Sequence, residues 1–224
     1  MQNNKIKLQK ISVTALFCAL AFLMTFLFRF KVSFLTFDFK DAIISVLSLL
    51  YGPLYGVVCA GVVSVLELLS VSDTGMYGLI MNFISSATFA LACGSVYKFK
   101  RDFTGAILSA AVSVISVTGV MMLANIFITP YYMGVTANDV IALIPTLLLP
   151  FNLCKSLINA ASFLIIYKPV TTALKKSGLV NVNGDVKFAL TKKTLLLALI
   201  SLIIIVFAIL YIIFVMNGSF SLTK

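Results

Sequence analysis

A series of long, apolar and almost uncharged stretches runs along the sequence, and this feature decides what the chain can fold into. Crossing about 30 Å of hydrocarbon takes about 20 residues of helix, and a helix satisfies its backbone hydrogen bonds internally. Hydrophobic residues make up 61% of the 224 residues and charged residues only 11%, which excludes an ordinary water-soluble globule. We therefore expect an all-α, multi-pass membrane protein.

Seven helices are expected from these stretches. They cover residues 11–28, 39–51, 54–70, 76–97, 103–129, 144–167 and 195–216. The second helix is short, because Gly52-Pro53 interrupts its apolar run. A basic stretch precedes the last helix, so we expect three parts: a six-helix core over residues 1–170, a cytoplasmic linker over 171–193, and an extra transmembrane helix with a short tail over 194–224.

Basic residues gather in alternate loops. The richer set contains Lys5, Lys7, Lys10, Lys98, Lys100, Arg101, Lys168, Lys175, Lys176, Lys187, Lys192 and Lys193, and the poorer set contains Arg29, Lys31, Lys40 and Lys224. Cytoplasmic loops of membrane proteins carry the excess of lysine and arginine. The pattern predicts a protein of the cell membrane with its N-terminus in the cytoplasm and its C-terminus outside.

Several kinds of chemistry are missing from the sequence. Histidine is absent, which removes His-based triads and His-ligated metals. The 4 cysteines lie inside apolar runs without CxxC spacing, which favours buried side chains over metal ligands or disulfides. No GxxxxGK[ST] phosphate loop occurs, so the chain is not expected to hydrolyse ATP by that route. We expect neither a catalytic site nor a metal site.

Lys155 is the one basic residue well inside an expected span. A mid-membrane lysine costs about 2.5 to 3.5 kcal/mol on insertion scales and needs a partner or a water-filled cavity. It could instead lie near a helix end and extend to the lipid headgroups.

Asn82, Asn125 and Asn152 are further polar residues in apolar runs, and an asparagine there could simply bond two helices together.

Considered as a set, these three amides and one ammonium on three helices favour a binding pocket. They could bond the edge of a polar planar ligand while aromatic side chains cover its faces. The candidates for the aromatic cover are Phe34, Phe37, Tyr131 and Tyr132.

Ala15 and Ala19 put two small residues one turn apart on the first helix. Such a small-xxx-small pair allows a second helix to approach closely. In isolation the pair is more typical of packing inside the bundle than of a contact with a partner.

A set of short motifs follows the order of the expected helices. They are Asp38-Phe39-Lys40-Asp41, Leu50-Tyr51-Gly52-Pro53-Leu54-Tyr55-Gly56, Asn82-Phe83 with Ala87-Thr88-Phe89, Tyr97-Lys98, Asn125 with Pro130-Tyr131, and Pro150-Phe151-Asn152 with Lys155. In this order they closely resemble motifs of the riboflavin-specific substrate-binding (S) subunits of energy-coupling-factor (ECF) transporters. The similarity covers roughly residues 10–169.

The resemblance implies a six-helix, S-component-like bundle that binds riboflavin near the outer face, under the loop joining the first two helices. The ligand-binding residues expected on this basis are Phe37, Asp41, Gly78, Asn82, Asn125, Tyr131, Asn152 and Lys155. Ala15 and Ala19 match the family's docking motif for the transmembrane coupling subunit, which itself binds two ATPases. The implied function is capture of riboflavin for ATP-driven uptake by partner subunits, with no cofactor and no catalysis by this chain.

Three other functions have to be weighed against this one. The same scaffold could bind another vitamin or a flavin nucleotide. An intramembrane enzyme would need a serine-lysine or paired-aspartate arrangement facing one cavity, and the sequence offers none that we can place. A purely structural scaffold would leave Lys155 without a purpose. The seventh expected helix lies outside the resemblance and is expected to be an accessory anchor.

Overall fold

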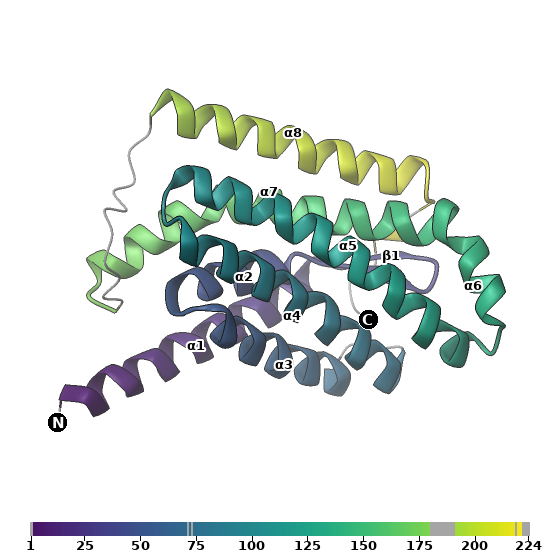
Figure 1. The fold of residues 1–224 in the computed structure, drawn as a ribbon, viewed down its shortest axis with the longest axis horizontal. Coiled ribbons are helices and arrows are strands. Elements are labelled where there is room, and N and C mark those ends of the chain that lie inside the picture. Colours follow the sequence, from purple (N-terminus) through teal and green to yellow (C-terminus); the bar gives the residue numbers. More distant parts are fainter. Residues whose placement is uncertain (1, 71, 73, 180–190, 218, 221–224) are drawn as a thin grey trace.

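The computed structural model describes residues 2–70, 72, 74–179, 191–217 and 219–220, which form a bundle of long helices with a small sheet near one end (Figure 1). The long helices are α1 (Gln2–Leu27), α3 (Pro53–Ser70), α4 (Gly75–Phe99), α5 (Phe103–Met133), α7 (Leu149–Lys176) and α8 (Lys192–Phe214). Shorter helical elements are α2 (Lys40–Tyr51), α6 (Ala137–Leu143) and the π-helical turn η1 (Ile144–Leu148). The strands are β1 (Phe30–Val32), β2 (Leu35–Phe37) and β3 (Ser219–Phe220).

Six helical segments of the described chain are long and apolar enough to cross a membrane. They are Ile6–Leu27, Pro53–Ser70, Gly75–Phe99, Phe103–Met133, Ala137–Lys176 and Lys192–Phe214. With 12 residues, α2 is shorter than a membrane span needs, as the Gly52-Pro53 interruption predicts. The expected all-α membrane fold is confirmed, and α8 is the appended seventh helix.

Several expected boundaries differ from the structure. The first helix begins at Gln2, and the sixth, expected over 144–167, is formed by α6, η1 and α7 from Ala137 to Lys176. The fifth helix does not end at Thr129: α5 continues through Pro130 to Met133, and because proline has no N–H, the i→i−4 bond to Ile126 O is missing inside the helix. It ends at Gly134, which has a φ of 67° and donates its N–H to Pro130 O. The expected linker over residues 171–193 overlaps α7, which extends to Lys176, and α8, which begins at Lys192. Residues 180–190 of that linker lie outside the described residues.

The sheet was not expected from the sequence. Strands β1 and β2 form a hairpin between α1 and α2, which we call the β-hairpin (residues 30–37). Strand β3 follows α8 and pairs antiparallel with β1, which gives the order β2-β1-β3. The segment after the appended helix is therefore bonded to the loop between the first two helices.

Two apolar clusters hold these elements together. The larger one buries side chains from α1, α2, α3, α4, α5 and α7, among them Phe17, Leu47, Val63, Phe89 and Phe163. The smaller one, which we call the hairpin cluster, joins the β-hairpin, α7 and α8 and contains Val32, Phe37, Phe151, Cys154, Ile158, Ala208 and Ile212. Figure 1 shows α8 running alongside α7. The appended helix thus shares an apolar core with the loop at the hairpin end of the bundle.

Glycine allows α2, α3 and α4 to approach closely. A Cβ on Gly56 would lie 2.8 Å from the Cβ of Ala90 and 2.9 Å from the Cβ of Ser48. At the same place Ser48 Oγ donates a hydrogen bond to Ala90 O over 2.7 Å. Since α2 does not span the bilayer, this contact with α3 and α4 helps to fix its position.

We predict that Gly56→Ala destabilises the protein by about 1 to 3 kcal/mol, because the added methyl group overpacks the contact with α4. Gly119→Ala is the matched control, since it makes the same change in an exposed part of α5 where a Cβ meets nothing within 4 Å. Thermal unfolding in detergent, followed by circular dichroism, measures both. Equal unfolding midpoints for the two variants would contradict the close-approach explanation.

Candidate functional site

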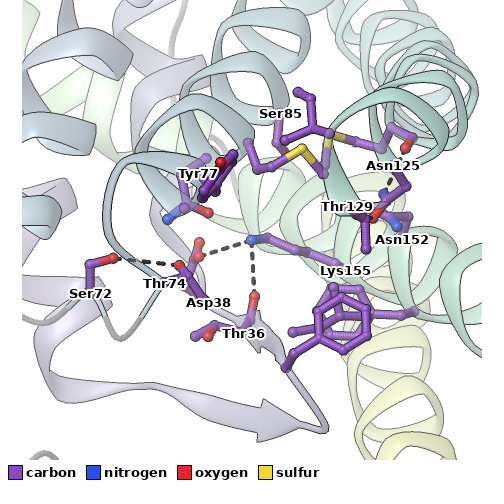
Figure 2. A pocket seen from close by; sticks show the side chains of 18 of the residues that line it. Thr36, Asp38, Ser72, Thr74, Tyr77, Ser85, Asn125, Thr129, Asn152 and Lys155 are labelled. Atoms are coloured by element: carbon purple, nitrogen blue, oxygen red, sulfur yellow. Dashed lines mark hydrogen bonds and ion pairs between the residues drawn. The ribbon is translucent and has the colours of Figure 1, made fainter. Parts of the chain in front are cut away.

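A cavity lies between the β-hairpin, the segment before α4, and the inner faces of α4, α5 and α7 (Figure 2). It offers about 90 Å³ to the centres of water molecules. Because one water needs only about 10 to 15 Å³ by this measure, the space is a cavity for several waters and not a packing defect. Its lining residues are Thr25, Arg29, Phe34, Leu35, Thr36, Asp38, Glu67, Ser72, Thr74, Tyr77, Gly78, Met81, Asn82, Ser85, Met121, Asn125, Ile128, Thr129, Tyr132, Phe151, Asn152 and Lys155.

Lys155 reaches into the middle of this cavity from α7 (Figure 2). Its Nζ donates to Asp38 Oδ2 over 3.0 Å and to the backbone O of Thr36 over 3.2 Å. The side chain of Lys155 is 7% exposed and that of Asp38 is 2% exposed, so the ammonium does not extend to the headgroups. The mid-membrane lysine therefore has both a carboxylate partner and a cavity.

A second lysine continues this chain of charges. Lys40 Nζ lies 3.6 Å from Asp38 Oδ2 and 2.6 Å from Glu67 Oε1, and its side chain is 1% exposed. Glu67 Oε2 accepts a hydrogen bond from Asn82 Nδ2 over 2.9 Å. The buried polar chain Lys155–Asp38–Lys40–Glu67–Asn82 thus links α7, the start of α2, α3 and α4. Uncompensated charges would be expensive here, and each charge in the chain has an opposite partner.

Asn159 supports the polar chain from one turn below Lys155. Its Nδ2 donates to Asp38 O over 2.9 Å and to Lys155 O over 3.1 Å, and its Oδ1 accepts from the backbone N–H of Ala42 over 3.1 Å. These bonds fasten the first turn of α2 to α7. Asn159, Asp38, Lys40 and Glu67 were not among the expected site residues. The signal that could have found Glu67 is that it is the one charged residue in the expected third span.

The amides of Asn125 and Asn152 lie on the α5 and α7 side of the cavity (Figure 2). Asn125 Nδ2 donates to Met121 O over 2.7 Å, and its Oδ1 accepts from Thr129 Oγ1 over 2.9 Å. Asn152 Nδ2 donates to Leu148 O over 2.8 Å. An amide has two N–H donors and a carbonyl with two lone pairs, so each of these side chains keeps capacity for a ligand.

Aromatic rings close part of the cavity. Phe34, at the tip of the β-hairpin, lies 6.2 Å from the ring of Tyr132, which lies 6.2 Å from the ring of Tyr77. Each of these three rings belongs to a lining residue. They can cover the face of a planar ligand, which is the role expected for Phe34 and Tyr132.

Three of the expected ligand-binding residues do not line this cavity. Phe37 is fully buried in the hairpin cluster, edge-on to Phe39 and Phe151, because successive residues of a strand face opposite sides. Tyr131 is 77% exposed on the outer side of α5, about 100° around the helix from Tyr132. Asp41 is buried but points to α4, where its Oδ1 accepts a hydrogen bond from Ser86 Oγ.

The remaining expected ligand-binding residues line the cavity together. Gly78, Asn82, Asn125, Asn152 and Lys155 come from α4, α5 and α7. Ala15 and Ala19 lie on an exposed face of α1, whereas Val13, Phe17 and Ala21 on the opposite face are buried. The alanine pair therefore does not serve packing inside the bundle. Among the described residues, no group of His, Cys, Asp and Glu is arranged to hold a metal ion.

Comparison with known proteins gives consistent matches. Residues 9–167 match the model of the family "ECF transporter, substrate-specific component". The riboflavin transporter RibU of Staphylococcus aureus (strain TCH60) is 29% identical over 79% of this chain and 95% of its own length. The riboflavin transporter FmnP of Bacillus subtilis (strain 168) is 25% identical over 72% of this chain and 91% of its own.

A solved structure agrees with these sequence matches. An S component of a bacterial ECF transporter superimposes with a TM-score of 0.64 and 27% sequence identity, over 78% of this chain and 99% of the other. The family model ends at residue 167, before α8 begins at Lys192. Since the matched residues make up well over half of the chain, the protein belongs to the family of substrate-specific components of ECF transporters.

Proposed function

We propose that this S component binds riboflavin in the cavity described above and delivers it to ECF partner subunits for ATP-driven uptake. The observation that carries the proposal is the convergence of Lys155, Asn125 and Asn152 on one cavity beneath the aromatic β-hairpin. The two relatives quoted above, which are named riboflavin transporters, support the same ligand class. In this proposal the chain captures the vitamin and has no catalytic step of its own.

The cavity groups fit the isoalloxazine ring system of a flavin. Its edge carries carbonyl oxygens and ring nitrogens, which suit an ammonium donor and amide groups that can both donate and accept. Its flat faces suit the rings of Phe34, Tyr77 and Tyr132. In this proposal Lys155 and Asn125 bond the polar edge, Asn152 and Asn82 supply further amides, and Gly78 leaves room in the wall.

Charge balance around the cavity favours an uncharged ligand. Of the residues that line it, the cations Arg29 and Lys155 equal in number the carboxylates Asp38 and Glu67. A neutral riboflavin leaves this balance intact, whereas the phosphate of a flavin nucleotide would bring unbalanced charge into a low-dielectric site. Competition between riboflavin, flavin mononucleotide and unrelated vitamins tests this preference directly.

The exposed alanine pair supports a contact with the coupling subunit. Small residues let helix backbones approach closely in lipid, where packing and not the hydrophobic effect drives association. In this proposal the face of α1 with Ala15 and Ala19 docks on the coupling subunit. The excess of basic residues in alternate loops supports a cytoplasmic N-terminus, with the cavity on the outer side.

The binding prediction concerns Lys155 and Asn125. Lys155→Met and Asn125→Ala should each weaken riboflavin binding by more than about tenfold. Lys155→Met removes a hydrogen bond from a charged donor, which costs about 1.5 to 3 kcal/mol, and Asn125→Ala leaves a buried polar atom of the ligand without a partner, which costs about 1 to 3 kcal/mol. Quenching of flavin fluorescence in a titration measures the affinity. Lys168→Met makes the same change as Lys155→Met on the same helix but outside the cavity, and it should leave the affinity unchanged. Parental affinity in both cavity variants would remove these residues from the ligand site.

The docking prediction separates binding from transport. Ala15→Trp combined with Ala19→Trp should abolish riboflavin uptake into cells and co-purification with the coupling subunit, because two bulky rings block close helix approach. Riboflavin binding to the isolated subunit should survive. The matched control is Ala111→Trp with Ile115→Trp, a pair with the same spacing on an exposed face of α5. Normal uptake by the α1 double variant, or loss of its ligand binding, would refute the docking assignment.

A further inference from the structure

The appended helix α8 and the strand after it contact the part of the protein that closes the cavity. Strand β3 pairs with β1, with Phe30 opposite Phe220 and Lys31 opposite Ser219. On its other side β1 pairs with β2, which contains Thr36. A segment outside the matched family region therefore extends the β-hairpin into a three-stranded sheet.

Side chains of α8 also pack into the hairpin cluster. Ala208 and Ile212, at 4% and 3% exposure, share this cluster with Val32 and Phe37 of the β-hairpin. Phe151 and Ile158 of α7 complete the same cluster. The cluster forms the apolar back of the hairpin, on the side away from Thr36.

The front of the β-hairpin is a wall of the ligand cavity. Phe34, Leu35 and Thr36 line the cavity, and the backbone O of Thr36 accepts a hydrogen bond from Lys155 Nζ. Phe151 belongs to both the cavity lining and the hairpin cluster. Any change in how α8 packs behind the hairpin is therefore transmitted to the cavity wall through direct contacts.

We propose that α8 and β3 form a tether for the β-hairpin, which positions it over the cavity and sets the rate at which ligand enters and leaves. This inference rests on the proposed riboflavin function, since Phe34, Leu35 and Thr36 of the hairpin form one wall of the proposed flavin site. In this proposal the flavin enters and leaves when the hairpin moves outward. Opening requires the hairpin to move against the bonds to β3 and the packing of α8.

A helix that served only as an anchor would not show these contacts. Anchoring needs a span of sufficient length and hydropathy, and α8 meets that need through exposed residues such as Ile203 and Phe207. It does not need a buried stripe against the β-hairpin or a strand added to β1. These two features bring α8 and β3 into contact with the cavity wall.

The first test uses substitutions on α8 in the full-length protein. Ile212→Ala removes buried atoms from the hairpin cluster, and Ile213→Ala makes the same change at the next residue, which is 41% exposed. We expect Ile212→Ala to accelerate riboflavin dissociation by at least about fivefold, measured by chasing labelled riboflavin with excess unlabelled riboflavin. Backbone hydrogen exchange over residues 30–37 should rise in the same variant without ligand. Ile213→Ala should match the parent in both measurements.

The second test locks the tether. Lys31→Cys with Ser219→Cys places two thiols on directly opposed residues of β1 and β3, which suits a disulfide. Oxidation should slow riboflavin association and dissociation by at least about fivefold, and a reducing agent should restore both rates. Lys31→Cys alone should not respond to oxidation.

The outcomes distinguish the two proposals. Unchanged hydrogen exchange and dissociation in Ile212→Ala, together with unchanged rates in the oxidised double-cysteine variant, would overturn the tether. Riboflavin failing to bind the parent protein, while hydrogen exchange over residues 30–37 still rises in Ile212→Ala, would overturn the proposed ligand and support the tether.

Discussion

The structure depends on the pairing of charges inside a bundle that is surrounded by lipid. Lys155 and Lys40 share Asp38, Lys40 also holds Glu67, and Asn82 completes the chain. The charged side chains of this chain are almost completely buried, so each charge is tolerable only while its partner stays in place. This requirement fixes α7, the start of α2, α3 and α4 relative to one another. The cavity lies beside this chain, and Asp38, Glu67, Asn82 and Lys155 belong to its lining.

The short α2 shows how the polar and apolar parts cooperate. At its first turn Lys40 pairs with α3, and Asn159 of α7 accepts the N–H of Ala42. Farther along, Ser48 bonds the backbone of α4 where Gly56 permits close approach. A helix too short to span the bilayer is thereby fastened at both ends. The β-hairpin ends at Phe37, two residues before α2 begins at Lys40. The position of this cavity wall therefore depends on how firmly α2 is held.

Much of this architecture could be predicted from the sequence. Uncharged apolar runs gave the seven helices, since span length in lipid is set by bilayer thickness. The isolated charge of Lys155 and the amides of Asn125 and Asn152 indicated the cavity.

The pairing of Lys40 with Glu67 was missed, because the two residues are 27 positions apart and only the packing of α2 on α3 brings them together. Phe37 and Tyr131 were misplaced because one step along a strand or helix turns a side chain to another face. The β-hairpin was missed because its strands are only three residues long.

The β1–β3 pairing also divides the sheet into parts of unequal stiffness. Among the residues that the structure describes, Phe30 and Lys31 are paired with β2 on one side and with β3 on the other. Beyond Val32 the turn contains Ser33, whose φ of 54° is unusual for a residue with a side chain. The end of the hairpin at Phe30 and Lys31 is therefore held by a strand on each side, while the turn that carries Phe34 lies beyond this double pairing. A force on the turn is passed back along the two strands, so outward movement of Phe34 is resisted where β1 is bonded to β3.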